Sequence, residues 1–582
     1  MEAKLSEEAA RDQRAASRSA SPIRVAAVVL IAIVLYAPLL SRQGFFSHED
    51  ATPYYRVLEY VGEIRDGHWL PQTFPRVFKG AGHAFPRFYA PIGNWIAVAM
   101  TFATGDVVVG VHASFLLSVV CSALAMYALL MAWSGDRTAA FVGALAYVGI
   151  PYRFENVFIR GALAEGWAFV WYPLILLGLW RTKTEGRVPM FLPLVLAGLV
   201  LTHPVMTLYF AVVALALSPL WLPTAERRAW TALALAGLAA LGLSAWSWLP
   251  QQYYLPTVWA SIPSAFWADP AHVEANRVPL QTVLTGLPKR NGLNLSVGWL
   301  ALAAHLLVLR AWLQRSRTAD RNRLEVMAGL LLVPWWLLLL FLMQPGPFLS
   351  VLPRQFGYIQ FPWRVVGLMG LLAVASFGCS FAATRERWVR VAGILAVVIV
   401  IARAGISPSV IPAWTSQYLE QQMAQGRKYG LTGNSEYLPR SVPGAGGDYY
   451  GALEALLARV AAGPRATPGV RVDSVTRHGS AADLVAVADV PGTVVLPMVY
   501  YDFYTARLAD GAGLAVRDSV GLLALDVPAG RHAIAVREGL TTVTWIGLAI
   551  SLGTLILLGG HTWLRYRGTD GEDSSVRWAS SS

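Results

Sequence analysis

Three ionisable residues stand together directly after the first long apolar run of the chain, which covers residues 25–40. They are His48, Glu49 and Asp50, and Pro53 follows shortly after them. A carboxylate at the edge of an apolar segment can serve as a general base, and adjacent carboxylates suit a hard divalent cation. Asp50 and Glu49 are therefore candidate catalytic residues. All three are candidate ligands for Mg²⁺ or Mn²⁺, although the sequence establishes no cofactor. A solvated loop with a helix cap at Asp50 or Thr52 ahead of Pro53 would explain the same residues.

Further polar residues lie at the ends of later apolar runs. An ionisable side chain at the centre of a membrane helix costs about 2.5–3.5 kcal/mol, so such residues need partners. Arginine presents a planar fork that suits phosphate oxygens. The residues that we expect to bind an anionic substrate are Arg76, Arg87, Arg160, Glu165, His203 and Arg364. The alternatives are that these arginines pair with Glu155, Glu165 and lipid head groups, and that His203 is a hydrogen-bonded packing residue.

The composition identifies a membrane protein. Of 582 residues, 55% are hydrophobic and 14% are charged, which is too apolar for a soluble chain. The net charge of +12 lies in short basic clusters between apolar runs, the pattern of cytoplasmic loops rather than of a nucleic-acid-binding surface. Cys121 and Cys379 both lie inside apolar runs, which favours helix packing over a disulfide.

Apolar runs of this kind predict about twelve transmembrane helices. A basic tail at 1–24 precedes the first run and no small-residue cleavage site follows that run, so we expect an uncleaved first span and cytoplasmic N- and C-termini. This topology requires the short run 92–103 to be interfacial or re-entrant within a first external loop at 41–107. The predicted spans are 25–40, 108–132, 138–150, 163–180, 188–202, 205–222, 229–249, 295–310, 325–343, 364–382, 389–405 and 541–560.

A change of composition after residue 405 predicts a second domain. Residues 406–540 are rich in Gly, Pro, Asp and Arg and lie between the membrane domain 25–405 and the last span 541–560, which a tail at 561–582 follows. The domain begins with a helical patch at 451–462 and continues with alternating apolar and polar residues between Pro-Gly turns. We therefore expect a mixed α/β to β-rich extracytoplasmic domain. Its predicted strands are 469–475, 482–487, 493–500, 522–527 and 532–536.

Several short motifs resemble those of a known group. They are Phe74-Pro-Arg76, Phe88-Tyr-Ala-Pro91, Arg160-Gly-Ala-Leu-Ala-Glu165, Thr202-His-Pro204, Gln360-Phe-Pro-Trp-Arg364 and Glu436-Tyr-Leu-Pro439. The pattern resembles the bacterial membrane family labelled 6-pyruvoyl-tetrahydropterin synthase-related, and residues 500–536 are similar to YfhO-like proteins. The label implies no pterin chemistry, because the chain shows no zinc module with three clustered histidines. Both groups look like the GT-C superfamily of integral membrane glycosyltransferases.

The resemblance implies a polytopic α-helical membrane protein with a GT-C-like domain. In that superfamily an acid in the first loop serves catalysis, and Asp50 matches its place, with Glu49 beside it. Related chains often carry His where this one has Tyr54 or Tyr55, which puts a histidine-dependent role there in doubt. Transfer from a lipid phosphate needs a base for the acceptor hydroxyl and cations for the departing phosphate, for which Arg160, Arg364, Arg76 and Arg87 are candidates.

The function implied is transfer of a sugar from a polyprenyl-phosphate donor to an extracytoplasmic acceptor, which would be a cell-envelope glycan, lipid or protein. We expect the bacterial inner (cytoplasmic) membrane as the location. Membrane lipids, the lipid-linked sugar and the acceptor are the expected partners, and nucleic acid is not one. Two alternatives remain open: a transporter or flippase of lipid-linked glycans, and a non-catalytic envelope assembly protein.

Overall fold

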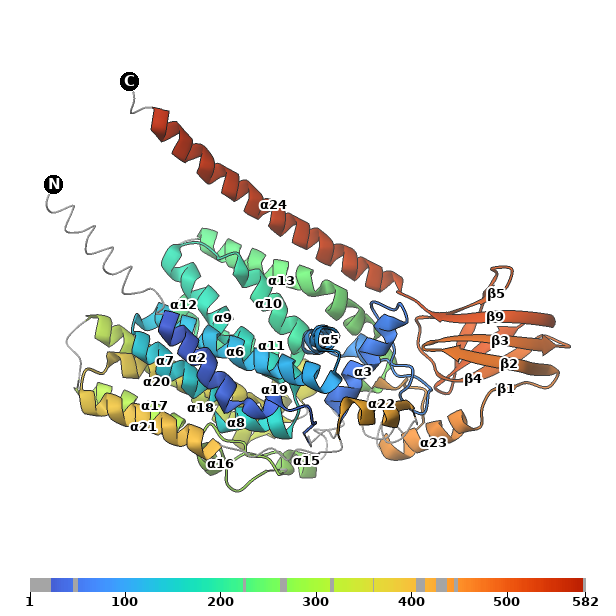
Figure 1. The fold of residues 1–582 in the computed structure, drawn as a ribbon, viewed down its shortest axis with the longest axis horizontal. Coiled ribbons are helices and arrows are strands. Elements are labelled where there is room, and N and C mark those ends of the chain that lie inside the picture. The colour runs from blue at the N-terminus through green and yellow to red at the C-terminus, as the bar shows by residue number, and fades with distance from the viewer. Residues whose placement is uncertain are drawn as a thin grey trace.

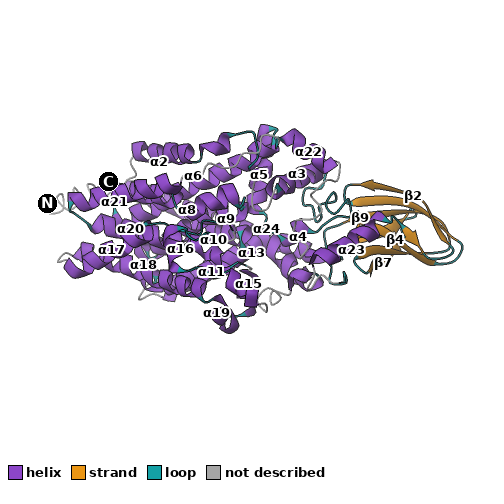
Figure 2. Ribbon diagram, turned by 90° about the horizontal axis from the view of Figure 1, so that it is seen from below, coloured by secondary structure: helices purple, strands orange, loops and turns teal. Residues whose placement is uncertain are grey.

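The computed structural model is a bundle of helices with a β-domain at one end (Figures 1 and 2). It describes residues 22–45, 51–222, 227–261, 270–290, 292–314, 319–359, 361–404, 414–424, 437–443 and 449–578. The start of α2 (Pro22–Leu35) and the end of α24 (Thr542–Trp578) both lie at the end of the bundle opposite the strands (Figure 1). This arrangement agrees with termini on one side of a membrane, although it does not establish which side.

Six helices of the described chain are long and apolar enough to cross a membrane. They are α6 (Val107–Ser134), α9 (Leu163–Glu185), α13 (Arg227–Tyr254), α18 (Ala319–Met343), α20 (Val366–Ala383) and α24. Shorter helices occupy five of the remaining predicted spans, namely α2, α7 (Arg137–Val148), α10 (Phe191–Thr202), α11 (Pro204–Ala216) and α17 (Leu300–Gln314). The 18-residue helix α21 (Arg387–Ala404) occupies the sixth. The membrane-protein class is thus supported, whereas twelve crossings are not confirmed.

Short helices connect these elements. They are α8 (Pro151–Phe154), the π-helix η2 (Glu155–Ile159), α12 (Ser218–Trp221), α15 (Pro270–Ala275), α16 (Leu280–Thr285) and α19 (Pro345–Val351). The 3₁₀ turns are η1 (Ala37–Leu40), η3 (Leu255–Thr257), η4 (Trp259–Ser261), η5 (Arg354–Ile359) and η6 (Pro362–Val365).

The helices differ sharply in how far the rest of the protein covers them. In α20, 94% of the apolar segment is buried inside the protein, so this helix forms the centre of the bundle, packed on α18, α17 and α7. The corresponding values are 22% for α13 and 11% for α24, which pack on each other at the edge. A Cβ on Gly547 would meet the backbone of Ala245, and Ser551 donates to the carbonyl of Gly242 at 2.9 Å. Small residues therefore let these two helices approach closely.

The first loop carries three helices of its own. They are α3 (Thr52–Arg65), α4 (Phe85–Phe88) and α5 (Ile92–Thr104). Helix α5 packs along α6, where a Cβ on Gly110 would overlap Thr101. Helix α5 is a 13-residue apolar helix, as the interfacial prediction requires, and its position relative to a membrane remains a prediction.

The β-domain contains two antiparallel sheets. Their strand orders are β1-β4-β8-β7 and β2-β3-β9-β5-β6. The strands are β1 (Arg465–Ala466), β2 (Val470–His478), β3 (Ala481–Ala488), β4 (Gly492–Val499), β5 (Tyr504–Leu508), β6 (Gly513–Leu514), β7 (Val516–Ser519), β8 (Leu522–Val527) and β9 (Gly530–Glu538). Helices α22 (Ser416–Ala424) and α23 (Tyr449–Ala461) precede them. All five predicted strands and the helical patch are present, and β1, β5, β6 and β7 are additional.

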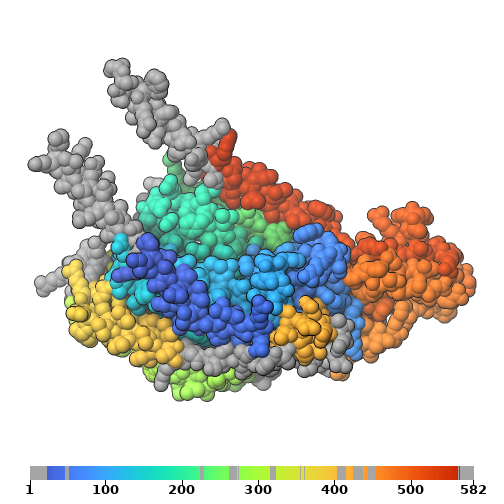
Figure 3. All heavy atoms as spheres, viewed as in Figure 1, coloured from blue at the N-terminus to red at the C-terminus, as the bar shows by residue number. Residues whose placement is uncertain are grey.

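Hydrogen bonds join the β-domain to the first loop. The Val499 N–H donates to the carbonyl of Ala81 at 2.8 Å. Both oxygens of Glu538, the last residue of β9, accept from the loop: the Gln72 N–H donates at 2.8 Å and the Thr73 hydroxyl at 2.6 Å. The loop that carries the candidate catalytic acids is thus held between the bundle and the β-domain. Figure 3 shows the β-domain projecting from the end of the bundle, with α24 along one side.

Candidate functional site

A break in the helix geometry brings Arg160 and Glu165 together. The π-helix ends with the Arg160 N–H donating to the Glu155 carbonyl at 2.8 Å. Gly161 then takes a left-handed φ of 64°, and α9 begins two residues later. Glu165 therefore lies in the first turn of α9, where the helix dipole favours a carboxylate. Single π-helical turns occur often at functional sites.

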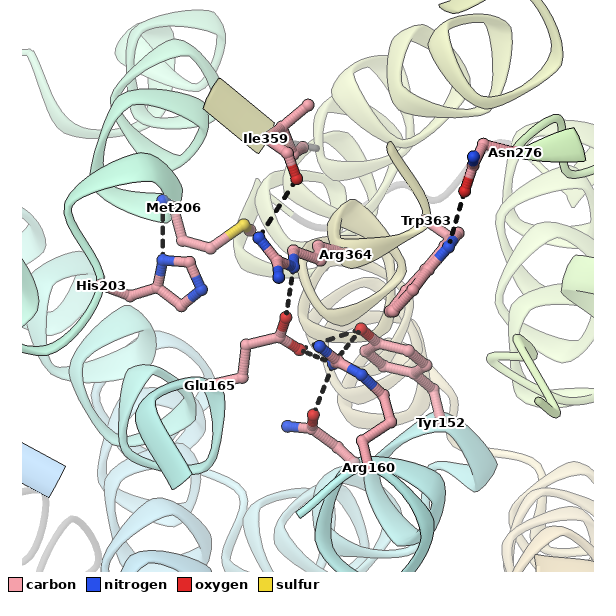
Figure 4. Close-up of polar contacts among 10 residues, drawn as sticks. Tyr152, Arg160, Glu165, His203, Met206, Asn276, Ile359, Trp363 and Arg364 are labelled. Atoms are coloured by element: carbon pink, nitrogen blue, oxygen red, sulfur yellow. Dashed lines mark hydrogen bonds and ion pairs between the residues drawn. The ribbon is translucent and has the colours of Figure 1, made fainter. Parts of the chain in front are cut away.

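Arg160 is the centre of a buried hydrogen-bond cluster. One of its nitrogens, Nη1, donates to Glu165 Oε2 at 2.5 Å and to Asn156 Oδ1 at 2.7 Å (Figure 4). The Tyr152 hydroxyl also donates to Glu165 Oε2, at 2.9 Å. Arg160 and Glu165 are each about 5% exposed, so water scarcely reaches the pair. When an ion pair is buried in this way, the loss of one partner leaves an uncompensated charge and strongly destabilises the protein.

Arg364 reaches the same carboxylate from another part of the chain. It lies in η6, directly before the central helix α20, and its Nε is 3.5 Å from Glu165 Oε1. That distance is an ion pair without a hydrogen bond, and Arg364 Nε has no hydrogen-bond partner among the described residues. Arg364 Nη1 donates to the Ile359 carbonyl at 3.2 Å. Two guanidinium groups thus share one carboxylate, and Arg364 is the less tightly held.

An aromatic residue next to Arg364 closes the other side of the cluster. The Arg160 guanidinium carbon lies 4.5 Å from the centre of the Trp363 ring, which is cation–π geometry. Trp363 is in turn fixed by its indole N–H, which donates to Asn276 Oδ1 at 3.1 Å. Trp363 therefore restrains the arginine from the side opposite Glu165 (Figure 4).

His203 lies between α10 and α11, beside Arg364 and Glu165 (Figure 4). Its Nδ1 accepts a long hydrogen bond from the Met206 N–H, at 3.4 Å, as a cap of α11. A neutral imidazole that accepts at Nδ1 carries its proton on Nε2. His203 can therefore donate a hydrogen bond to an anionic oxygen near Arg364.

The other two arginines expected at the site lie elsewhere. Arg76 donates to the Leu58 carbonyl at 3.2 Å and pairs with Glu59 at 3.5 Å. Arg87 donates to the Thr544 hydroxyl of α24 at 2.6 Å. Neither residue has a described contact in the Arg160–Glu165–Arg364 cluster. Arg160, Glu165, Arg364 and His203 are thus brought together, whereas Arg76 and Arg87 are not part of the group.

His48, Glu49 and Asp50 fall outside the residues that the structure describes, and so does Glu436. The structure does describe the segments that flank His48, Glu49 and Asp50. Phe45, Pro53 and Tyr54 line a small hollow together with Gly161, the residue after Arg160. The catalytic and metal-binding roles of the three acidic-loop residues remain predictions. Among the described residues, no group of three His, Cys, Asp or Glu side chains could hold a metal ion.

A family model described as "6-pyruvoyl-tetrahydropterin synthase related domain; membrane protein" matches residues 86–411, more than half of the chain. The chain belongs to this family. The match covers the arginine cluster and begins within the first loop. It identifies a membrane protein.

The other comparisons are more distant. The cryo-EM structure of arabinofuranosyltransferase AftD from Mycobacteria matches with 15% sequence identity and a TM-score of 0.43. The match covers 70% of this chain and 27% of AftD, so the chain spans about a quarter of that protein. No curated protein matches the sequence.

The structure also assigns a place to His112, a residue of this family member that sequence reasoning did not select. His112 Nδ1 donates to the Ser41 carbonyl at 2.9 Å, so its Nε2 accepts from the Tyr54 hydroxyl, also at 2.9 Å. Tyr54 in turn accepts from the Phe45 N–H at 3.1 Å. These contacts tie both ends of the acidic segment to α6. The available signal was a histidine near the start of an otherwise apolar run.

Proposed function

We propose that the protein is a membrane glycosyltransferase that moves a sugar from a polyprenyl-phosphate donor to an extracytoplasmic acceptor in the bacterial cell envelope. The single observation that carries the proposal is the sharing of Glu165 by two arginines inside the helical bundle. Arg364 keeps an Nε–H without a hydrogen-bond acceptor among the described residues. A buried donor of this kind favours an anionic ligand.

The leaving phosphate is the group that this cluster suits. When the bond between the sugar and the phosphate breaks, negative charge develops on the phosphate oxygens. Arg364 can stabilise that charge directly, and the Nε2–H of His203 can donate to a neighbouring oxygen. Arg160 is held more firmly by Glu165 and Trp363, so its role is to fix Glu165 and present positive charge to the site.

The acceptor needs a base on the opposite side of the sugar. We assign this role to Asp50, with Glu49 as the alternative, because the residues flanking them line the hollow next to Gly161. The base removes the proton of the acceptor hydroxyl as its oxygen attacks the anomeric carbon. The β-domain, which binds the same loop through Glu538, would orient the acceptor.

Transfer of a labelled sugar in reconstituted vesicles tests the proposal. Wild-type protein should move the label from a polyprenyl-phosphate donor to an acceptor, and Arg364→Gln should lose most of this activity. Arg187→Gln is the matched control, because Arg187 is 73% exposed and remote from the cluster. Mass analysis of lipid-linked sugars and surface glycans, with and without the protein, complements the assay. Movement of intact lipid-linked glycans without transfer would instead identify a flippase, and neither activity would favour an assembly protein.

A further inference from the structure

A second buried arginine lies apart from the site described above. Arg87 is 5% exposed, and its Nη1 donates to the Thr544 hydroxyl at the start of α24. Its other two nitrogens, Nε and Nη2, have no hydrogen-bond partner among the described residues. The rings of Tyr254 and Phe503 lie 5.2 and 5.3 Å from the guanidinium carbon. No described carboxylate forms an ion pair with Arg87.

This guanidinium remains charged under ordinary conditions. Burial lowers the pKa of Arg87 to about 10, which is still well above neutral pH. The charge of Glu538 favours the charged form of Arg87, yet both oxygens of Glu538 already accept hydrogen bonds from the first loop. Burial also raises the pKa of Glu538, which favours the neutral form of this carboxyl group. A buried positive charge with two unused donors is costly unless an anion or water satisfies it.

Arg87 faces a small cavity. Its volume is about 30 Å³, and it is partly open to the outside. A space of roughly 10–15 Å³ holds one water, so this cavity has room for about two oxygen atoms of a phosphate whose remainder lies at the opening. The polar side chains in its wall besides Arg87 belong to Gln72, Ser247 and Thr544, and the larger aromatic ones to Tyr60, Trp95 and Trp246.

The surroundings favour a lipid over a free anion. The cavity lies where the first loop meets α13 and α24, the two long apolar helices that the protein covers least. Figure 3 shows α24 along the surface of the bundle, so lipid chains can lie directly beside it. Tryptophans such as Trp95 and Trp246 are typical of the level of lipid head groups. A phosphate at this level would reach Arg87 while its acyl or isoprenoid chains stay in the membrane.

We propose that the cavity beside Arg87 binds the phosphate group of a membrane lipid. Arg87 supplies Nε–H and Nη2–H to two phosphate oxygens, and Ser247 supplies a hydroxyl. The lipid thereby joins the first loop to α13 and α24, next to the contact between the loop and the β-domain. This proposal does not depend on glycosyl transfer, since none of these residues belongs to the Arg160–Glu165–Arg364 cluster.

Native mass spectrometry of the full-length protein tests the proposal. Detergent-purified protein is titrated separately with phosphatidylglycerol, with a polyprenyl phosphate and with diacylglycerol, which lacks the phosphate. Wild type should retain a phosphate-bearing lipid that Arg87→Gln retains at least tenfold less, apart from any polyprenyl phosphate held by the Arg160–Glu165–Arg364 cluster, and neither protein should retain diacylglycerol. Arg65→Gln, an exposed change on the same loop, should behave as wild type. Retention of phosphatidylglycerol alone assigns the site to a bilayer phospholipid, and retention of polyprenyl phosphate alone assigns it to the isoprenoid carrier.

Two further variants keep the outcome decisive. Arg364→Gln should still retain phosphatidylglycerol, or the part of the bound polyprenyl phosphate that Arg87→Gln releases, and loss of that lipid in Arg364→Gln would assign it to the central cluster and overturn the proposal. Ser247→Val narrows the cavity while leaving Arg87 and Thr544 in place, so it should also release the lipid even if Arg87→Gln fails to fold. Equal lipid retention by wild type and Ser247→Val would show that the lipid binds outside this cavity and would overturn the proposal.

Discussion

Arg364 and Glu165 approach within 3.5 Å without forming a hydrogen bond, although both are largely buried. Arg160, by contrast, bonds the same carboxylate at 2.5 Å. The two arginines should therefore respond differently to replacement, because one is committed to a structural pair and the other is available for a ligand.

Arg364→Gln should weaken polyprenyl-phosphate binding by about 10-fold or more, since a hydrogen bond to a charged group contributes about 1.5–3 kcal/mol. Its thermal unfolding should change little. Arg160→Gln should instead destabilise the protein by about 3–5 kcal/mol, the usual cost of breaking a buried ion pair from one side. Binding titrations and thermal unfolding of both variants provide the measurement. Similar destabilisation by both changes would make the whole cluster structural.

Tyr54→Phe should loosen the segment that carries Asp50. The change removes the donor to His112 and the acceptor of the Phe45 N–H, and unsatisfied buried groups cost about 1–3 kcal/mol. We expect a lower unfolding temperature and reduced turnover with donor affinity retained. His112→Asn should have the same effects, because both residues act through one hydrogen-bond chain. Tyr253→Phe is a control on a tyrosine that is 62% exposed, and an equal loss there would remove the special role of Tyr54.

The arginine cluster shows what the sequence could predict. Ionisable residues at the ends of apolar runs pointed to Arg160, Glu165 and Arg364, because a charge in or beside a membrane needs a partner. The same signal selected Arg87, which the structure places against α24 instead. Apolar runs fix the depth of a residue along the helices, whereas the side of the bundle that it faces depends on how the helices pack. Only the structure shows which side of the bundle a residue faces.

Local geometry limited the prediction in other ways. The π-helix at Glu155–Ile159 differs from an α-helix by its hydrogen-bond register, and no residue pattern in this segment predicts that register. In the β-domain the alternating runs predicted the longer strands, while β5 and β7 have only five and four residues. Strands of that length carry too few alternations to stand out, and pairing with β9 and β8 forms them.

The contact between the first loop and the β-domain should depend on pH. Burial raises the pKa of Glu63 from its ordinary 4.5 to about 7; the hydrogen bond from His68 opposes this rise, and the charges of Glu538 and Asp66 add to it. Arg477, on β2, also lies within electrostatic range of Glu63. Because the folded protein holds this proton more tightly than the unfolded chain, the stabilising contribution is complete below about pH 4.5. It is lost as the pH rises through about 7.

Thermal unfolding of the full chain between pH 5 and 8 measures this effect. Wild type should lose stability across that interval, and Glu63→Gln should flatten the profile because its amide does not titrate. Burial also raises the pKa of Glu59 to about 7, with the same sign, so the double Gln variant should be flatter still. A profile unchanged by both substitutions would contradict the assignment.

Membrane topology can be tested with single cysteines, in a background where Cys121 and Cys379, both unpaired in the structure, are replaced by Ala. Positions 187, 317 and 387 should face the cytoplasm, whereas 281 and 450 should face outside. A membrane-impermeant thiol reagent applied to intact cells should label only the latter two. External labelling at 317 or 387 would show that α5 crosses the membrane and would invert every later loop.

Asp50→Asn addresses the chemistry most directly. The amide keeps the size of the side chain but removes the charge that accepts a proton, so turnover should fall by about two orders of magnitude or more for a general base. Donor binding should persist, because Arg364 and His203 are unchanged. Glu49→Gln should be milder. Addition and removal of Mg²⁺ or Mn²⁺ in the vesicle transfer assay would show separately whether His48, Glu49 and Asp50 hold a cation. Wild-type turnover in Asp50→Asn together with inactivity of Glu49→Gln would transfer the role of base to Glu49, since the two carboxylates are neighbours on the same short segment.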